Sequence, residues 1–394
     1  MNWKKSIWLA AALLTATVHV HAQDNLINAL KNNVSDNSKE GFTFTEVINL
    51  GNTSIKDQGS SGTCWSYSGN SFLESEMIRM GKQPIEISSI YTARNTYIEK
   101  AKNFVRLHGS QAQGDGGQLH DVLTIFRKYG AVPQEVYSGL QDGQARNNFS
   151  EMSPILQSIT STVAKSKKPS KNWIKAFTAA MDSYLGEVPE TFEYKGKTYT
   201  PHTFADEVIG INPDDYVGIS SFEEHAYYKP FVLLIPDNWS FESFYNVQIN
   251  DLTDIIDNAL QNGYTVAWAT DVSEKSFSWK NGVAYVPEKP IEQMTAEEQA
   301  SMFNGPKPEP QITAVQRQEA FDDYSTTDDH GMHIVGSVKD QNGKEYYIVK
   351  NSWGESNDYK GYMYVTKEYV RYKTISLLLH KKALTKNMQF KLGI

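Results

Sequence analysis

One cysteine, Cys64, is present among the 394 residues, and this limits how the chain can hold its fold together. A single cysteine cannot form a disulfide within the chain, so the fold must be stabilised by buried apolar side chains. With 40% hydrophobic residues, the composition is sufficient for such a core. A lone cysteine is most often a small buried side chain, but it is also available for chemistry.

The first 22 residues have the layout of an export signal. Lys4 and Lys5 precede an apolar run over residues 7–18, and a small-residue cleavage pattern ends at Ala22. We expect cleavage after Ala22 and a secreted or periplasmic protein, with no membrane attachment once the signal is removed. The net charge of −8 becomes −10 without the two lysines, and this acidic balance disfavours nucleic acid as a partner.

Apolar periodicity and turn signals predict an α+β protein with two lobes. The expected helices cover 64–80, 119–129, 171–185 and 252–260. The expected strands cover 42–50, 264–269, 331–338, 345–349 and 361–365. After the signal at 1–22, the expected divisions are an N-terminal arm and helical lobe (23–140), an inserted, mostly helical region (141–250) and a β-rich lobe (251–394).

The segment DQGSSGTCW, residues 57–65, places small residues directly before Cys64 at the predicted start of a helix. The positive end of a helix dipole stabilises a thiolate, and glycines allow a substrate backbone to come close. The backbone N–H of Cys64 and the side-chain amide of Gln58 could stabilise an oxyanion formed when a thiolate attacks a carbonyl. The same segment is compatible with a glycine-rich turn ahead of a buried thiol.

A thiolate nucleophile needs a base, usually histidine, and a third group that orients the base. Residues 328–354 predict a β-hairpin with its turn at residues 342–343, and Asn351 lies at the open end. An Asn351 amide oxygen could accept a hydrogen bond from an imidazole there, and Trp353 could cover that bond from water.

Two histidines, His330 and His333, compete for the role of base. Because they are three residues apart on a strand, they face opposite sides of the sheet, and this spacing does not show which side faces Cys64. Because the two side chains point to opposite sides of the sheet, binding of one metal ion by both is disfavoured. The sequence also has no Cys or carboxylate cluster to complete a zinc shell. We therefore expect no metal.

Three segments resemble the papain-like cysteine peptidases: Gln58…Cys64-Trp65, Asp329-His330-Gly331 and Asn351-Ser352-Trp353-Gly354. The chain departs from the general papain pattern at Ser61, where that family has a disulfide cysteine, and at Thr63. The more specific resemblance is to the bleomycin hydrolase and aminopeptidase C branch. It rests on Gln-Gly-Ser-Ser-Gly at 58–62, Asp-Gly-Gly-Gln at 115–118, Lys-Tyr-Gly at 128–130 and Pro-Glu-Thr-Phe at 189–192.

This resemblance implies a papain-like fold, with a helical lobe, a β-barrel-like lobe and a large helical insertion, and it implies no cofactor. Cys64 would attack the peptide carbonyl, and His330 rather than His333 would protonate the leaving amine. Asn351 would orient His330, and Gln58 would hold the oxyanion together with the Cys64 backbone. The other residues expected to contact the substrate are Gly62, Trp65, Gly116, Gly117 and Trp353.

The same resemblance implies a homo-oligomer, since members of the branch are typically hexamers whose C-terminal carboxylate captures the substrate amine. The tail at residues 380–394 is short and lacks the Trp-Asp-Pro ending of the branch. The leading prediction is an exported cysteine aminopeptidase acting on peptides. An endopeptidase or dipeptidyl peptidase of the same fold is the alternative, and a catalytically silent binding protein is a further one.

Overall fold

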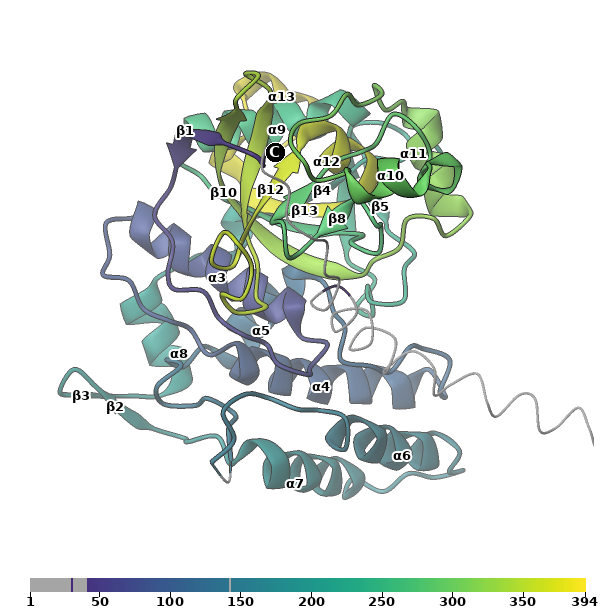
Figure 1. Ribbon diagram of the computed structural model, residues 1–394. Coiled ribbons are helices and arrows are strands. Elements are labelled where there is room, and N and C mark those ends of the chain that lie inside the picture. The colour runs from purple at the N-terminus through teal and green to yellow at the C-terminus, as the bar shows by residue number, and fades with distance from the viewer. Residues whose placement is uncertain (1–29, 31–40, 142) are drawn as a thin grey trace, which may run out of the picture.

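A computed structural model describes residue 30 and residues 41–141 and 143–394. The predicted export signal lies outside these residues. The chain forms a helical lobe and a sheet lobe, which confirms the predicted α+β class (Figure 1). Helices α3 and α5 lie between the sheet and the other helices of the first lobe. Within the described residues, no helix has the length and apolar character needed to cross a membrane.

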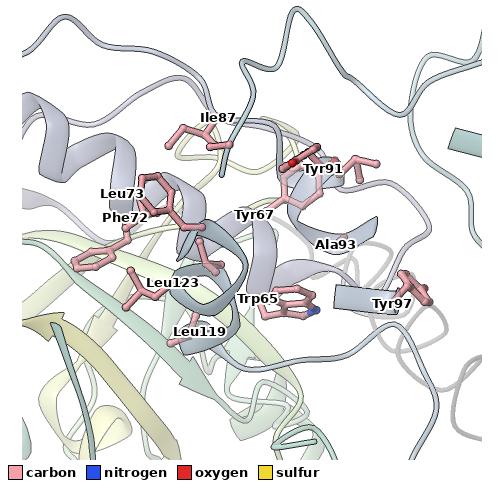
Figure 2. Close-up of a cluster of buried hydrophobic side chains, with 14 of the residues drawn as sticks. Trp65, Tyr67, Phe72, Leu73, Ile87, Tyr91, Ala93, Tyr97, Leu119 and Leu123 are labelled. Carbon is pink, nitrogen blue, oxygen red and sulfur yellow. The ribbon is translucent and has the colours of Figure 1, made fainter. Parts of the chain in front are cut away.

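The helical lobe contains the elements between residues 64 and 215. They are α3 (Cys64–Arg79), α4 (Ser89–Arg106), α5 (Leu119–Tyr129), α6 (Met152–Ala164), α7 (Trp173–Leu185), the hairpin β2 (Phe192–Tyr194) and β3 (Lys197–Tyr199), α8 (Pro201–Phe204), the π-helix Ala205–Ile209 and the 3-10 helix Pro213–Asp215. The predicted helices at 64–80, 119–129 and 171–185 correspond to α3, α5 and α7. Figure 2 shows aromatic and aliphatic side chains of α3, α4 and α5 meeting in one cluster.

Helix α4 was not predicted, because its buried faces carry polar as well as apolar residues. The Arg94 guanidinium donates to the Asp182 carboxylate at 2.9 Å, which ties α4 to α7. Glu99 accepts from Lys102 at 2.7 Å and from the Tyr129 hydroxyl at 2.6 Å. Pairing of this kind makes burial of charged groups tolerable, but it removes the apolar stripe by which a helix is recognised.

The sheet lobe is built on one mixed sheet whose strand order is β5-β6-β4-β13-β7-β10-β11-β12-β9-β8, with β1 paired to β10. The strands are β1 (Phe44–Asn49), β4 (Tyr216–Ser220), β5 (Pro230–Val232), β6 (Ser243–Asn246), β7 (Val266–Thr270), β8 (Phe277–Ser278), β9 (Val283–Ala284), β10 (His330–Asp340), β11 (Glu345–Lys350), β12 (Tyr362–Thr366) and β13 (Thr374–His380). Strands β4 to β6 precede residue 251, so this sheet begins earlier than expected. Four of the five β4 residues are buried, so β4 lacks the alternation that marks a half-exposed strand.

Strand β7 shows how the sheet separates two cores. Ala267 and Ala269 point to the side of α3 and belong to the helical core, whereas Val266 and Trp268 belong to the core on the opposite face. Alternation along a strand requires this division. The small alanines let α3 pack close to the sheet beside the nucleophile segment.

The opposite face of the sheet is covered by helices from the second half of the chain. They are α9 (Ile249–Gln261), α12 (Lys367–Lys373) and α13 (Lys386–Leu392), while α10 (Ala296–Ala300), α11 (Ala314–Asp322) and the 3-10 helices Ile291–Gln293 and Lys381–Ala383 complete the lobe. The C-terminal segment packs on this face, since Asn258 of α9 donates to the Ala383 carbonyl at 2.6 Å and Leu392 is buried in the same core. The chain end therefore lies beside α9 and α13 (Figure 1).

The predicted hairpin of β10 and β11 is present, with its turn at the expected residues. The Asp340 carboxylate accepts from the backbone N–H groups of Asn342 at 2.8 Å and Lys344 at 3.0 Å. Gly343 has a φ of +82°, a conformation that glycine adopts without steric cost. The hairpin fixes the register that carries His333 opposite Lys350 and brings Asn351 to the end where His330 lies.

Candidate active site

Cys64 is the first residue of α3, and β10 packs directly against it. Cys64 is 4% exposed, and its thiol interacts with the backbone N–H groups of Trp65 and Gly331. This approach requires a glycine, because a Cβ on Gly331 would lie 2.7 Å from Ser68 Oγ and 3.1 Å from Trp65 Cα. Gly331 thus brings the start of β10, and with it His330, to the first turn of α3.

The His330 ring is held by Asn351 and covered by Trp353. His330 Nε2 lies 2.7 Å from Asn351 Oδ1, and the same oxygen accepts from the Ser352 backbone N–H at 2.7 Å. An oxygen that accepts at this position makes Nε2 the protonated ring nitrogen. The Trp353 ring is 4.5 Å from the His330 ring and almost fully buried, so water is excluded from the bond, as the sequence led us to expect.

His333 points to the other side of β10 and contacts the middle of α3. Its Nδ1 lies 3.0 Å from Ser71 Oγ, and its ring meets Phe72 edge-on at 6.0 Å. Burial, with a smaller contribution from nearby Lys350, holds the pKa of His333 well below its ordinary value. His333 is therefore a neutral packing residue, and the two histidines face opposite sides as expected.

Gln58 joins the nucleophile loop to the segment that follows Asn351. It is fully buried, its Nε2 donates to the Ser61 carbonyl at 2.6 Å, and its Oε1 accepts from Ser352 Oγ at 2.7 Å. Ser61 donates to the Gln58 carbonyl at 2.8 Å and lies 2.7 Å from Thr63 Oγ1. Hydroxyl hydrogen bonds thus help to hold this loop.

Asp115 holds Gly62 and Trp65, two of the residues expected to contact substrate. Its carboxylate accepts from the Gly62 N–H at 3.2 Å, and its carbonyl accepts from Trp65 Nε1 at 2.9 Å. The hydroxyls of Tyr97 and Ser153 donate to the same carboxylate. The Asp-Gly-Gly-Gln motif pointed to this stretch, but the sequence carried no signal that Asp115 anchors the nucleophile loop.

Gly116 and Gly117 follow Asp115 in the chain and pack against Asp237 and Trp65. A Cβ on Gly117 would lie 2.8 Å from both the Trp65 ring and Asp121 Oδ2, so its backbone packs tightly beside the nucleophile helix. A Cβ on Gly116 would lie 2.1 Å from Asp237 Oδ2. The carboxyl group of Asp237, which the sequence did not single out, therefore rests on the Gly116 backbone.

The electrostatic surroundings of Cys64 disfavour an isolated thiolate. Burial raises the pKa of the Cys64 thiol to about 12, with further increases from Asp328 and Asp237, and the N–H groups of Gly331 and Trp65 only partly oppose this. The sequence led us to expect a helix terminus that stabilises the thiolate. Burial acts against such an effect, so a thiolate at neutral pH requires transfer of its proton to a neighbouring base.

Carboxyl groups surround the site on the side of Asp237. Burial, reinforced by Asp237 and Asp329, raises the pKa of Asp328 well above its ordinary value, and the Gln118 side chain donates to Asp328. Burial also raises the pKa of Asp121 to about 7. Among residues 41–141 and 143–394, no three His, Cys, Asp or Glu side chains are grouped so that they could hold a metal ion.

Comparisons with known proteins agree with this geometry. Residues 5–393 match the model of the peptidase C1-like family. The chain is 23% identical to aminopeptidase G of Lactobacillus delbrueckii subsp. lactis over 400 residues, covering 90% of this chain and 87% of that protein. It is also 23% identical to aminopeptidase C of Lactococcus lactis subsp. lactis over 380 residues, covering 86% and 83%.

The crystal structure of pepW from Lactobacillus rhamnosis HN001 has a similar fold. Its TM-score is 0.70 at 20% sequence identity, and the match covers 100% of this chain and 95% of the other. The two chains therefore share one architecture.

Proposed function

The chain belongs to the peptidase C1-like family and is a cysteine peptidase, and from this premise we propose that it is an aminopeptidase whose nucleophile is Cys64. The observation that carries the proposal is the contact between the start of β10 and the start of α3. The His330–Asn351 hydrogen bond of 2.7 Å fixes the imidazole, and the backbone N–H of Gly331, the residue after His330, contacts the Cys64 thiol. A nucleophile, a base and a group that orients the base are the parts that acyl transfer requires.

In the proposed reaction the proton of Cys64 passes to His330 Nδ1, and the sulfur adds to the carbonyl carbon of the peptide bond. The carbonyl electrons move to oxygen and then return as the C–N bond breaks, while the imidazolium gives its proton to the leaving amine. The remaining thioester is hydrolysed when His330 takes a proton from water, hydroxide adds to the carbonyl carbon and the thiolate leaves. Asn351 holds Nε2–H through both steps, so that Nδ1 stays directed toward the reacting atoms.

The oxyanion formed in each step needs hydrogen-bond donors at the start of α3. The backbone N–H of Cys64 belongs to the first helical turn, whose N–H groups have no acceptor within the helix. Gln58 Nε2 uses one N–H for the Ser61 carbonyl and has a second to offer. These two groups support an oxyanion site of the kind that contributes about 10²–10³-fold to the rate per donor.

Export is part of the proposal and depends only on the sequence. The two lysines, the apolar run and the pattern ending at Ala22 are the features that support it. Sequencing the N-terminus of the protein recovered from the secretory or periplasmic fraction tests this, and we expect Gln23 as the first residue. An N-terminus that retains residues 1–22 would contradict it.

Peptide hydrolysis tests the proposed function. A fluorogenic peptide with a free N-terminus is compared with the same peptide acetylated, with Cys64→Ser as the blank. An aminopeptidase cleaves the free form, and His330→Ala abolishes turnover, whereas His333→Ala, the matched histidine substitution, retains it. Equal cleavage of both peptides would indicate an endopeptidase, and cleavage of neither above the blank would refute the proposal.

A further inference from the structure

Asp237 occupies a position from which it can recognise one end of a substrate. We propose that its carboxylate binds the protonated α-amino group of the peptide, an inference that rests on the proposed peptidase function.

A chain of contacts connects Cys64 with Asp237. Trp65 follows Cys64, the Gly117 backbone packs on the Trp65 ring, and the Asp237 carboxyl rests on the adjacent Gly116. A peptide bound at Cys64 and running along these glycines would meet this carboxyl within a short distance. The Asp237 carboxyl fills the space that a Cβ on Gly116 would occupy, so it lies directly beside this part of the backbone. This arrangement favours an exopeptidase.

The loop that carries Asp237 is held firmly on both sides. The next residue, Asn238, is buried and its side-chain amide donates to the carbonyls of Leu233 and Glu242, each at 2.9 Å. Trp239 is buried as well, and its Nε1 donates to Asp121 at the start of α5 at 2.7 Å. A charged group fixed in this way loses little freedom on binding, which is the condition for a strong contribution to affinity.

The charge of this region suits a cation. Asp237 and Asp328 both act on the Cys64 thiol and both raise its pKa, so negative potential extends to the nucleophile. An ammonium group bound at Asp237 would offset that potential and gain a charge-assisted hydrogen bond. An acetylated terminus carries no positive charge and would not gain this bond.

The chain's own terminal carboxylate is not in this position. The segment after β13 packs on the α9 face, where Lys391 Nζ lies 3.2 Å from the Tyr228 hydroxyl and Leu392 is buried. Cys64 lies on the α3 face of the same sheet. Residues 391 and 392 therefore lie on the opposite face of the sheet from Cys64, whereas Asp237 lies against Gly116 on the Cys64 side.

The test measures kcat and KM for a free-amine peptide and its acetylated form with wild type, Asp237→Asn, Asp237→Glu and the control Asp254→Asn. Asp254 is exposed on α9, and its substitution removes the same charge far from the site. Each protein is titrated with an iodoacetamide probe, so that rates refer to intact Cys64 thiol. Circular dichroism and urea denaturation report whether each variant is folded.

We expect Asp237→Asn to raise KM for the free-amine peptide and to lower kcat/KM about 10- to 100-fold, the range of a lost charge-assisted hydrogen bond. Cleavage of the acetylated peptide stays as in wild type, Asp254→Asn changes neither, and Asp237→Glu recovers part of the loss.

Other outcomes separate this inference from the function on which it rests. If wild type prefers the free amine and folded Asp237→Asn keeps that preference, Asp237 does not bind the amine, while the aminopeptidase proposal stands. If wild type cleaves both peptides equally, the amine is not recognised at all, and only cysteine peptidase activity remains. If neither peptide is cleaved above the Cys64→Ser blank, the proposed function fails and this inference fails with it.

Discussion

Substituting Gly331 with alanine inserts a methyl group between β10 and the first turn of α3. That carbon would lie 2.7 Å from Ser68 Oγ, 3.1 Å from Trp65 Cα and 3.2 Å from Trp65 N. The Ser68 hydroxyl can rotate away, but doing so weakens its hydrogen bonds to the carbonyls of Cys64 and Trp65. The backbone of Trp65 cannot rotate, so strand and helix must separate by a few tenths of an ångström.

The size of the effect follows from these contacts. Overpacking a buried site typically costs about 1–3 kcal/mol, and loss of a buried hydroxyl hydrogen bond costs about 1 kcal/mol, so we expect the free energy of unfolding to fall by about 2–4 kcal/mol. Misplacing catalytic groups by about 1 Å lowers rates about 100-fold, so a displacement of a few tenths of that should lower kcat about 4- to 10-fold. KM should change little, because the substrate surface at Gly116 and Gly117 is not touched.

Urea denaturation followed by tryptophan fluorescence measures the first quantity, and steady-state kinetics with titrated Cys64 measure the second. Gly114→Ala is the matched control: it makes the same substitution near the site, where the new Cβ would have no atom within 4 Å. If Gly331→Ala unfolds at the same urea concentration and turns over at the same rate as Gly114→Ala, close packing at Gly331 does not position His330, and the reasoning is wrong.

Three further substitutions have distinct expected results. Asn351→Ala removes the acceptor of His330 Nε2–H and should lower kcat at least about 10-fold with little change in KM; an unchanged kcat would contradict the orienting role. His333→Ala leaves a cavity beside α3 and should lower the free energy of unfolding by about 2–4 kcal/mol in urea while retaining turnover, and loss of turnover would show that the wrong histidine was chosen. Burial raises the pKa of Asp121 from 3.8 to about 7, so its proton is held more tightly in the folded state; the associated stability is complete below pH 3.8 and is lost as the pH rises through 7. Asp121→Asn removes this dependence and should gain about 2–3 kcal/mol relative to wild type between pH 5 and pH 8, whereas parallel pH curves would argue against it.

The parts of the site that carry local sequence signals could be predicted. Cys64 follows a run of small residues at a helix start, and the turn at residues 342–343 sets the register of the hairpin that joins His330 to Asn351. Both features depend on neighbours within a few tens of residues, where turn chemistry and periodicity are informative. The opposed facings of His330 and His333 followed from strand geometry alone.

The parts that depend on distant contacts could not be predicted. Asp237 has no local pattern that marks it, because its loop is held through Trp239 by Asp121, far along the chain. The motif at 115–118 marked Asp115, but its contact with Gly62, 53 residues away, carried no sequence signal. The depth at which Cys64 is buried was equally hidden, and with it the rise in the pKa of its thiol. Helix α4 and strand β4 escaped notice because burial on all sides leaves no amphipathic period.

The place of β13 in the sheet has a consequence for biosynthesis. Residues 374–380 pair with β7 on one side and β4 on the other, so the last strand of the described chain joins two halves of the sheet. Until the ribosome has released β13, β4 and β7 each keep an unpaired edge, and the sheet on which α3 packs is incomplete. Long-range closure of this kind is slow and leaves partly made chains prone to wrong pairing. A nascent chain should therefore be catalytically silent until residues 374–380 have left the ribosome and paired with both strands.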